Sequence, residues 1–71
     1  MISYKPLMKL LIDLEIKKTE LAERIGISSA TLAKFNTNDY VSLEVIDRIC
    51  EELDCQPGDI IEYIPDDKIE E

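Results

Sequence analysis

The 71 residues include no histidine, so two cysteines and sixteen carboxylates are the side chains best suited to hold a metal, and the commonest general base is absent. Histidine is the commonest general base and nitrogen ligand in proteins. Cys50 and Cys55 lie five positions apart, and no second cysteine pair completes a tetrahedral zinc site. No nucleophile stands beside a base. The sequence therefore predicts no enzyme activity, no metal and no cofactor, with both cysteines as reduced thiols.

Length and composition favour one small folded domain. A chain of 71 residues has room for a single core, and its 19 Ile and Leu residues exceed what a disordered segment carries. The longest apolar runs have three residues, whereas a membrane span needs about 20. Asp13 and Glu15 interrupt the region where a signal peptide would lie. We expect a domain over residues 1–65, an acidic tail over residues 66–71, no membrane contact and a cytoplasmic location.

The charge of the chain is unevenly distributed. The net charge is −8, but residues 1–40 sum to +1 and residues 41–71 sum to −9. Proteins that bind nucleic acids are usually basic on at least one face. A site for an anionic partner is therefore expected in the first 40 residues, and a separate acidic surface in the remainder.

Apolar side chains recur at helical spacing, with breaks at residues that favour helix ends. Pro6 suits the first turn of a helix, and Gly26 suits the left-handed residue that closes one. Ser28 and Ser42 are typical amino-terminal caps. The segment 61–64 could be extended and pair with residues 2–4. The sequence thus predicts an all-α fold of five short helices with a small two-stranded pairing of the chain ends; the helices cover about residues 6–15, 18–25, 29–36, 43–53 and 57–61.

Only Gly26 and Ile27 separate the second predicted helix from Ser28, the expected cap of the third. Two short helices joined by a tight turn at a glycine form a helix-turn-helix, whose second helix enters the DNA major groove. Ala22 is small enough to let the two helices cross closely. An apolar wedge between them is expected from Leu21, Ile25, Ile27, Leu32 and Phe35.

A longer pattern runs through the segment Lys18–Phe35. It has a Glu-Leu-Ala triplet, a glycine four residues after that alanine, a serine opening the next helix, and a leucine six residues after the glycine. This pattern resembles the lambda-repressor-like, Cro-type helix-turn-helix regulators, and the resemblance covers about residues 5–61. It implies a five-helix DNA-binding domain that acts as a transcriptional regulator on double-stranded DNA, with the third helix in the major groove.

The resemblance also implies roles for individual residues. Lys34 would donate to guanine O6 or N7, and Ala30 would touch a thymine methyl. Lys17 and Lys18 stand where many relatives have a capping Thr or Ser followed by Gln. The residues implied to face bases are Ser29, Ala30, Ala33 and Lys34, and those implied to contact phosphates are Lys17, Lys18, Ser28, Thr37 and Asn38.

A protein-interaction module is the alternative function. The apolar wedge would be core in any helical bundle, so it does not by itself indicate DNA binding. The eleven acidic residues after Val41 could engage a basic partner, such as a toxin or a polymerase subunit. On the DNA-binding reading we expect a homodimer, because two-fold assembly reaches two half-sites. Candidate dimer residues, which could equally pack within one protomer, are Ile60, Ile61, Tyr63 and Ile64.

Overall fold

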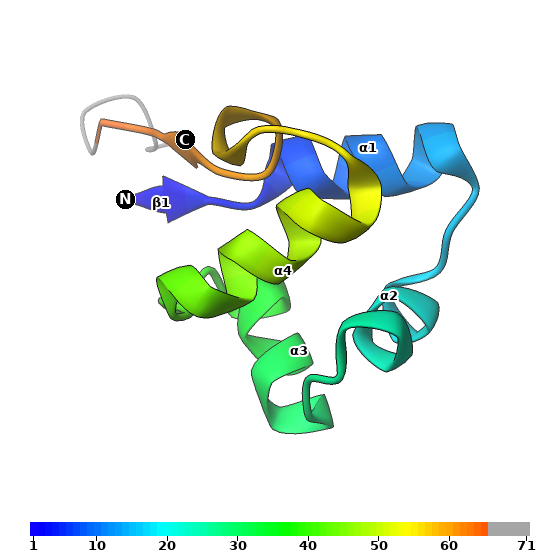
Figure 1. Cartoon of the computed structure of the whole chain (residues 1–71). Coiled ribbons are helices and arrows are strands. Elements are labelled where there is room, and N and C mark those ends of the chain that lie inside the picture. Colours follow the sequence, from blue (N-terminus) through cyan, green and yellow to red (C-terminus); the bar gives the residue numbers. More distant parts are fainter. Residues whose placement is uncertain (66–71) are drawn as a thin grey trace.

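The computed structural model describes residues 1–65, which contain four α-helices, one 3₁₀ turn and a two-stranded sheet (Figure 1). The strands β1 (Ile2–Ser3) and β2 (Glu62–Tyr63) are antiparallel, with Ile2 opposite Tyr63. The mostly helical class and the pairing of the chain ends are therefore confirmed. The predicted acidic tail, residues 66–71, lies outside the described residues. The helices are α1 (Lys5–Leu14), α2 (Lys18–Ile25), α3 (Ser29–Thr37) and α4 (Leu43–Leu53).

The predicted fifth helix over residues 57–61 is wrong: the chain makes only one 3₁₀ turn there, η1 (Pro57–Asp59). The Asp59 carboxylate accepts a hydrogen bond from the Gln56 N–H at 3.0 Å and closes the turn. Ile60 is fully buried, and its carbonyl accepts from the N–H of Leu7 at 3.2 Å. The chain leaves the helical path after Ile60, because pairing β2 with β1 requires extended backbone from there on. Ile60 is thus a core residue of the protomer and not part of a dimer surface.

The helix ends follow local sequence signals. Ser28 Oγ accepts from the N–H of Thr31 at 3.1 Å, and Ser42 Oγ accepts from the N–H of Val45 at 3.2 Å. Gly26 closes α2 in the left-handed conformation, with φ of 74°. These contacts satisfy backbone groups that have no partner inside a helix.

One core joins all four helices to the chain ends. The fully buried side chains include Leu7 of α1, Leu21 of α2 and Ile49 of α4, together with Ile60. Phe35 is the buried side chain of α3, so the third helix is anchored mainly through one aromatic ring. The predicted wedge is partly confirmed: Leu21, Ile25 and Phe35 are buried, whereas Ile27 and Leu32 are half-buried and pack against the core.

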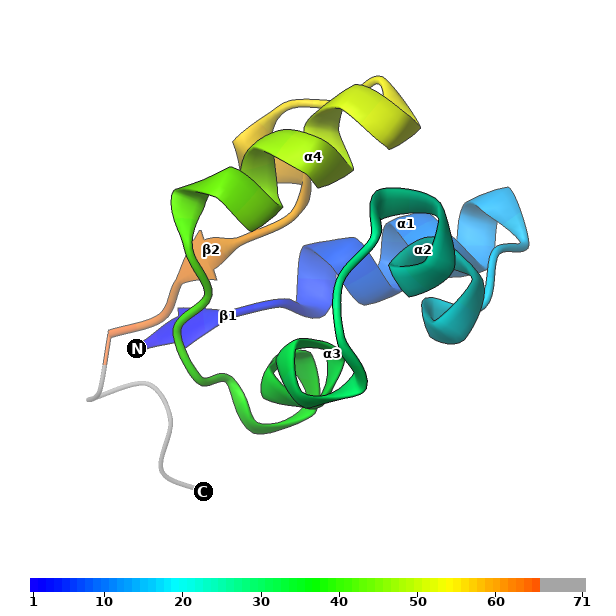
Figure 2. The same cartoon turned by 60° about the horizontal axis from the view of Figure 1, so that its bottom comes forward.

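The arrangement leaves one side of α3 uncovered. In Figure 1, α4 crosses the centre of the molecule, and α3 lies below it at the lower edge. After the rotation in Figure 2, α3 again lies at the lower edge, and the segment that follows it runs beside β1 and β2 to reach α4. Among residues 1–65 no helix is both long and apolar enough to span a bilayer.

Candidate nucleic-acid interface

The outer face of α3 is exposed along its length. Phe35 is buried and Leu32 is half-buried, which sets the inward side of the helix at a three-residue spacing. The positions turned away from that side are open to solvent. All four residues expected to face bases, Ser29, Ala30, Ala33 and Lys34, are exposed on this surface.

The amino-terminal end of α3 is closed by Ser28. Its Oγ accepts from the Thr31 N–H, and its hydroxyl lies 3.1 Å from Thr31 Oγ1. The Ser28 side chain is therefore already engaged in hydrogen bonds within the protein. The first-turn N–H groups of Ser29 and Ala30 have no acceptor inside the helix and point out of its amino-terminal end, where the helix dipole favours an anion.

The start of α2 lacks such a cap. Lys17 is the N-cap residue, is exposed, and makes no capping hydrogen bond with its side chain. The Lys18 ammonium donates to Asn36 Oδ1 at 2.5 Å, so it ties the start of α2 to the last turn of α3. Lys18 thus has a structural contact that its position in the sequence does not reveal, while the first-turn amides of α2 stay uncapped by side chains.

The carboxyl-terminal end of α3 holds the two remaining expected phosphate contacts. Thr37 is the last residue of the helix, and its Oγ1 donates to Asp39 Oδ2 at 2.9 Å. Asn38 adopts the left-handed conformation, with φ of 58°, and its N–H bonds to the carbonyl of Lys34. The Asp39 carboxylate places a negative charge beside Thr37, which works against a phosphate at that hydroxyl.

Tyr4 positions α3, a role that sequence reasoning missed. Its ring packs edge-on against Phe35, with centroids 4.7 Å apart and planes at 73°. Its hydroxyl donates to the carbonyl of Asp39 at 2.5 Å. Burial raises the pKa of this phenol. Tyr4 therefore holds both the buried side of α3 and the segment that follows it. The sequence did not reveal this role, because the three residues ahead of the first helix are too few to show a periodic pattern.

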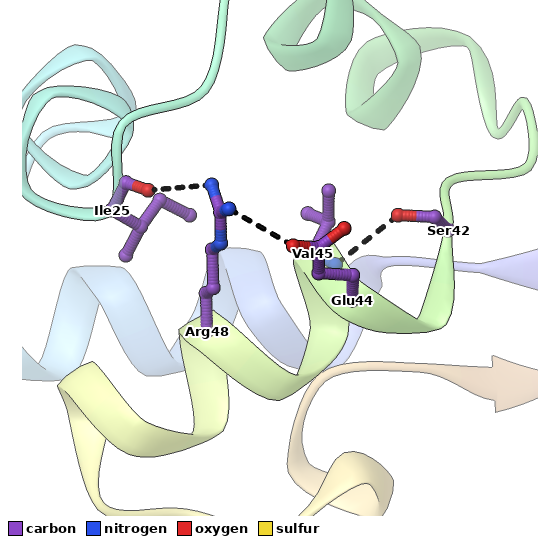
Figure 3. A network of polar contacts seen from close by, with 5 residues as sticks. All are labelled: Ile25, Ser42, Glu44, Val45 and Arg48. Atoms are coloured by element: carbon purple, nitrogen blue, oxygen red, sulfur yellow. Dashed lines mark hydrogen bonds and ion pairs between the residues drawn. The ribbon is translucent and has the colours of Figure 1, made fainter.

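Arg48 joins α4 to the carboxyl-terminal end of α2 (Figure 3). One guanidinium nitrogen donates to the carbonyl of Ile25 at 3.2 Å, and the other lies 3.0 Å from Glu44 Oε2. Arginine at a helix carboxyl terminus is favourable because the last carbonyls lack intrahelical donors. The spacing of Glu44 and Arg48 indicates a helical ion pair in the sequence, but the contact with Ile25 follows only from the packing.

The basic side chains of α2 and α3 differ in whether they are paired with acids of the protein. Arg24 is paired with Glu20 at 2.7 Å and with Glu52 at 3.5 Å, so both of its partners are acids of the protein itself. By contrast, the side chains of Lys17 and Lys34 make no hydrogen bond or ion pair within residues 1–65. α4, which carries most of the acids of residues 41–65, lies above α3 in Figures 1 and 2. Within the described residues, unpaired positive charge is therefore available beside α2 and α3 at Lys17 and Lys34, as it also is on α1 at Lys5 and Lys9.

The cysteines lie away from this surface, at the end of α4. Both are half-buried free thiols, and the N–H of Cys55 bonds to the carbonyl of Cys50 at 3.1 Å. Burial raises the pKa of the Cys55 thiol to about 11, and the neighbouring Cys50 and Asp59 add to the rise. Within residues 1–65, no three His, Cys, Asp or Glu side chains gather as metal ligands.

Comparison with known proteins agrees with this geometry. A family profile described as the Cro/C1-type HTH DNA-binding domain matches residues 6–66. An uncharacterized HTH-type transcriptional regulator, YozG of Bacillus subtilis (strain 168), is 45% identical over 51 residues, which cover 69% of this chain. The matched part spans 61% of that relative, less than two thirds of its length. The crystal structure of transcriptional regulator VanUg, Form II, superposes with a TM-score of 0.89 at 52% identity, covering 92% of this chain and 87% of that one.

Proposed function

Because the chain belongs to the family of Cro/C1-type helix-turn-helix DNA-binding domains, we propose that it regulates transcription by binding a specific sequence of double-stranded DNA in the cytoplasm. The observation that carries this proposal is the uncovered outer face of α3, which bears an unpaired lysine and small side chains. A helix of this kind fits the major groove, which is wide enough to admit it. No catalytic step is part of the function.

Base recognition is assigned to the exposed face of α3. Lys34 has no partner in the described part of the chain, so its ammonium is free to donate to guanine O6 or N7. Ala30 and Ala33 are suited to contact with thymine methyl groups, and the Ser29 hydroxyl accepts several partners. Because this face has one charged side chain, few hydrogen bonds from side chains to base edges are expected. Part of the specificity is therefore assigned to DNA shape and to a second protomer.

Phosphate contacts are assigned to the start of α2 and to both ends of α3. Lys17 supplies an unpaired charge beside the uncapped amides of α2, and Lys18 supplies a second charge next to Asn36. Ser28 and the first-turn amides form the contact at the start of α3. Thr37 and Asn38 are the weaker candidates, because Asp39 lies beside the Thr37 hydroxyl.

A homodimer completes the proposal. Two copies related by a two-fold axis place two α3 helices in successive major grooves, about 34 Å apart. Each protomer then contributes a small number of phosphate contacts, which sum over the complex.

The proposal is tested by selecting bound sequences from a random DNA pool and measuring affinity for the selected site. We expect binding to weaken with about the third to fifth power of the salt concentration. Lys34→Ala should cost about 1–3 kcal/mol and relax the preference at one base position. Lys17→Ala should weaken binding to all sequences alike and lower the salt exponent by about one.

Lys9→Ala is the matched control, since it removes the same charge from an exposed residue of α1. If Lys34→Ala and Lys9→Ala left the base preference equally unchanged, α3 would not be the reading helix. No retention of any DNA at low salt would contradict the function itself.

A protein-interaction module is the second candidate, favoured by the exposed carboxylates of α4. Asp47 and Glu51 are exposed and have no cationic partner within residues 1–65, unlike Glu44 and Glu52. Specific retention of one basic protein that weakens as salt rises, with no DNA retained at low salt, would decide for this alternative.

A further inference from the structure

The two cysteines lie on either side of the residue that closes α4. Asp54 ends this helix in the left-handed conformation, with φ of 53°. The carbonyl of Cys50 accepts from the N–H of Asp54 and, at 3.1 Å, from the N–H of Cys55. In helix endings of this type, the residue after the left-handed one commonly packs its side chain against the residue five positions earlier. Here both members of that pair are cysteines.

The backbone geometry brings the two cysteines within the range of a disulfide. A carbonyl oxygen lies about 2.4 Å from the Cα of its own residue, and an amide nitrogen about 1.5 Å from its own. Because the hydrogen bond between them is 3.1 Å long, the Cα atoms of Cys50 and Cys55 are at most about 7 Å apart. Disulfides join Cα atoms about 4.4–6.8 Å apart. The side chains are also near neighbours, since the Cys50 thiol contributes to the raised pKa of Cys55.

We propose that Cys50 and Cys55 form a redox-active dithiol, which a small-molecule disulfide oxidises reversibly to an intrachain disulfide across the end of α4. Both thiols are free and half-buried, so a small reagent can reach them while the folded backbone keeps them paired. The pair lies away from the outer face of α3, so this chemistry does not depend on the proposed function.

Oxidation transfers two electrons and two protons to the small disulfide. Burial raises the pKa of the Cys55 thiol to about 11, so this thiol is seldom ionised near neutral pH, and the first attack is assigned to Cys50. The Cys50 thiolate bonds to one sulfur of the reagent, whose S–S bond breaks and releases one small thiolate. Cys55 then loses its proton, attacks Cys50 Sγ in this mixed disulfide and releases the second. Two protein thiols and one small disulfide thus give one protein disulfide and two small thiols.

The disulfide would fasten the end of α4 to the turn that follows it. Cys55 comes directly before Gln56 and η1, and both cysteines pack against the hydrophobic core. In the unfolded chain the thiols meet only by random closure of the segment between them. Because folding and oxidation form one thermodynamic cycle, a fold that pairs the thiols favours the disulfide, and the disulfide stabilises the fold by the same factor. The loop-closure entropy of six residues sets that factor at about 40, and native strain lowers it.

The test is the redox equilibrium of the full chain with reduced and oxidised glutathione, measured without denaturant and in about 6 M guanidinium chloride at about pH 8. After an acid quench, alkylation and mass spectrometry separate the dithiol, the mixed disulfide and the intrachain disulfide. We expect oxidation of the folded chain to be about 10- to 40-fold more favourable than that of the unfolded chain. The product should be monomeric, and dithiothreitol should restore both thiols. Its midpoint of thermal unfolding should lie about 9–15 °C above that of the reduced chain.

The double variant Cys55→Ala with Gln56→Cys is the matched control, because it keeps two cysteines but moves one thiol away from the pairing position. Gln56 is exposed, so this replacement leaves the core unchanged. We expect the folded and unfolded forms of the control to oxidise equally readily, within about twofold. A control that matched the unmodified chain would show that the helix ending does not pair the thiols, and would overturn the proposal.

Three other results would also overturn it. One is a folded chain that oxidises no more readily than the unfolded chain. The second is a product made of disulfide-linked dimers in place of the intrachain bond. The third is a midpoint of thermal unfolding that oxidation leaves unchanged. Failure of DNA binding is distinguishable from all of these, because a chain that oxidises as expected but retains no DNA would contradict the proposed function alone.

Discussion

Replacing Gly26 with alanine tests the turn on which the helix-turn-helix depends. Gly26 has φ of 74° and ψ of 37°, and a Cβ built at this position meets no atom within 4 Å. The cost of the substitution is therefore conformational and not steric. For an L-residue the left-handed conformation costs about 1–2 kcal/mol, a large share of the roughly 3–5 kcal/mol that a domain of this size retains.

The expected loss converts to a readily measured change in melting temperature. At about 2.1 cal/mol/K of unfolding entropy per residue, this chain changes its midpoint by about 7 °C for each kcal/mol. Gly26→Ala should thus lower the midpoint by about 7–13 °C in a thermal unfolding experiment followed by circular dichroism. Gly26→Asn should lose less, because asparagine tolerates this conformation, as Asn38 does at the end of α3.

Gly58→Ala is the matched control. Gly58 lies in η1, its φ is not in the left-handed region, and a Cβ there also meets nothing within 4 Å. We expect a change of less than about 0.5 kcal/mol, or a slight gain from the lower entropy of the unfolded chain. Equal midpoints for Gly26→Ala and Gly58→Ala would refute the reasoning, since the two positions differ mainly in backbone conformation.

Two further predictions concern the groups that hold α3 and the end of α4. Tyr4→Phe removes the hydrogen bond to the Asp39 carbonyl but keeps the packing on Phe35, so denaturant unfolding should show a loss of about 0.5–1.5 kcal/mol; an unchanged midpoint would exclude a role for that hydroxyl. The pKa of Cys55 is raised to about 11 in the folded chain, so the folded state keeps its proton where the unfolded state loses it. The contribution of Cys55 to stability should then be constant below about pH 8 and fall between about pH 9 and pH 11, by less than about 2 kcal/mol because solvent screens this partly exposed thiol. Cys55→Ala should reduce this fall, although a smaller contribution in the same direction remains from Tyr4.

Much of the helical structure could be read from the chain because the signals are local. The predicted ranges 18–25 and 43–53 coincide with α2 and α4, and the range 29–36 is one residue shorter than α3. Apolar periodicity and serine caps act within one or two helical turns, so neighbours in sequence suffice to define them. The failure at residues 57–61 has the opposite cause. There the pairing of β2 with β1, near the start of the chain, outweighs a weak local tendency to continue the helix.

The candidate site likewise has some features that local sequence predicts and others that depend on distant residues. The exposure of the four α3 residues follows from the spacing of Leu32 and Phe35, and it was predictable without coordinates. The partner of Lys18 was not, because Asn36 lies 18 residues further along the chain. The paired state of Arg24 was also hidden, since one of its two acids comes from α4.

The sequence by itself determined the helix-turn-helix, the glycine that closes α2, the caps of α3 and α4, and the separation of charge between the two parts of the chain. Tertiary structure alone decided the anchoring of α3 by Tyr4, 35 residues from its partner Asp39, and the bond from Arg48 to Ile25, 23 residues away. It also decided the gathering of Ile2, Tyr40 and Leu43 around one groove. Local features depend on backbone preferences within a few residues, whereas these contacts exist only after the core has brought distant segments together.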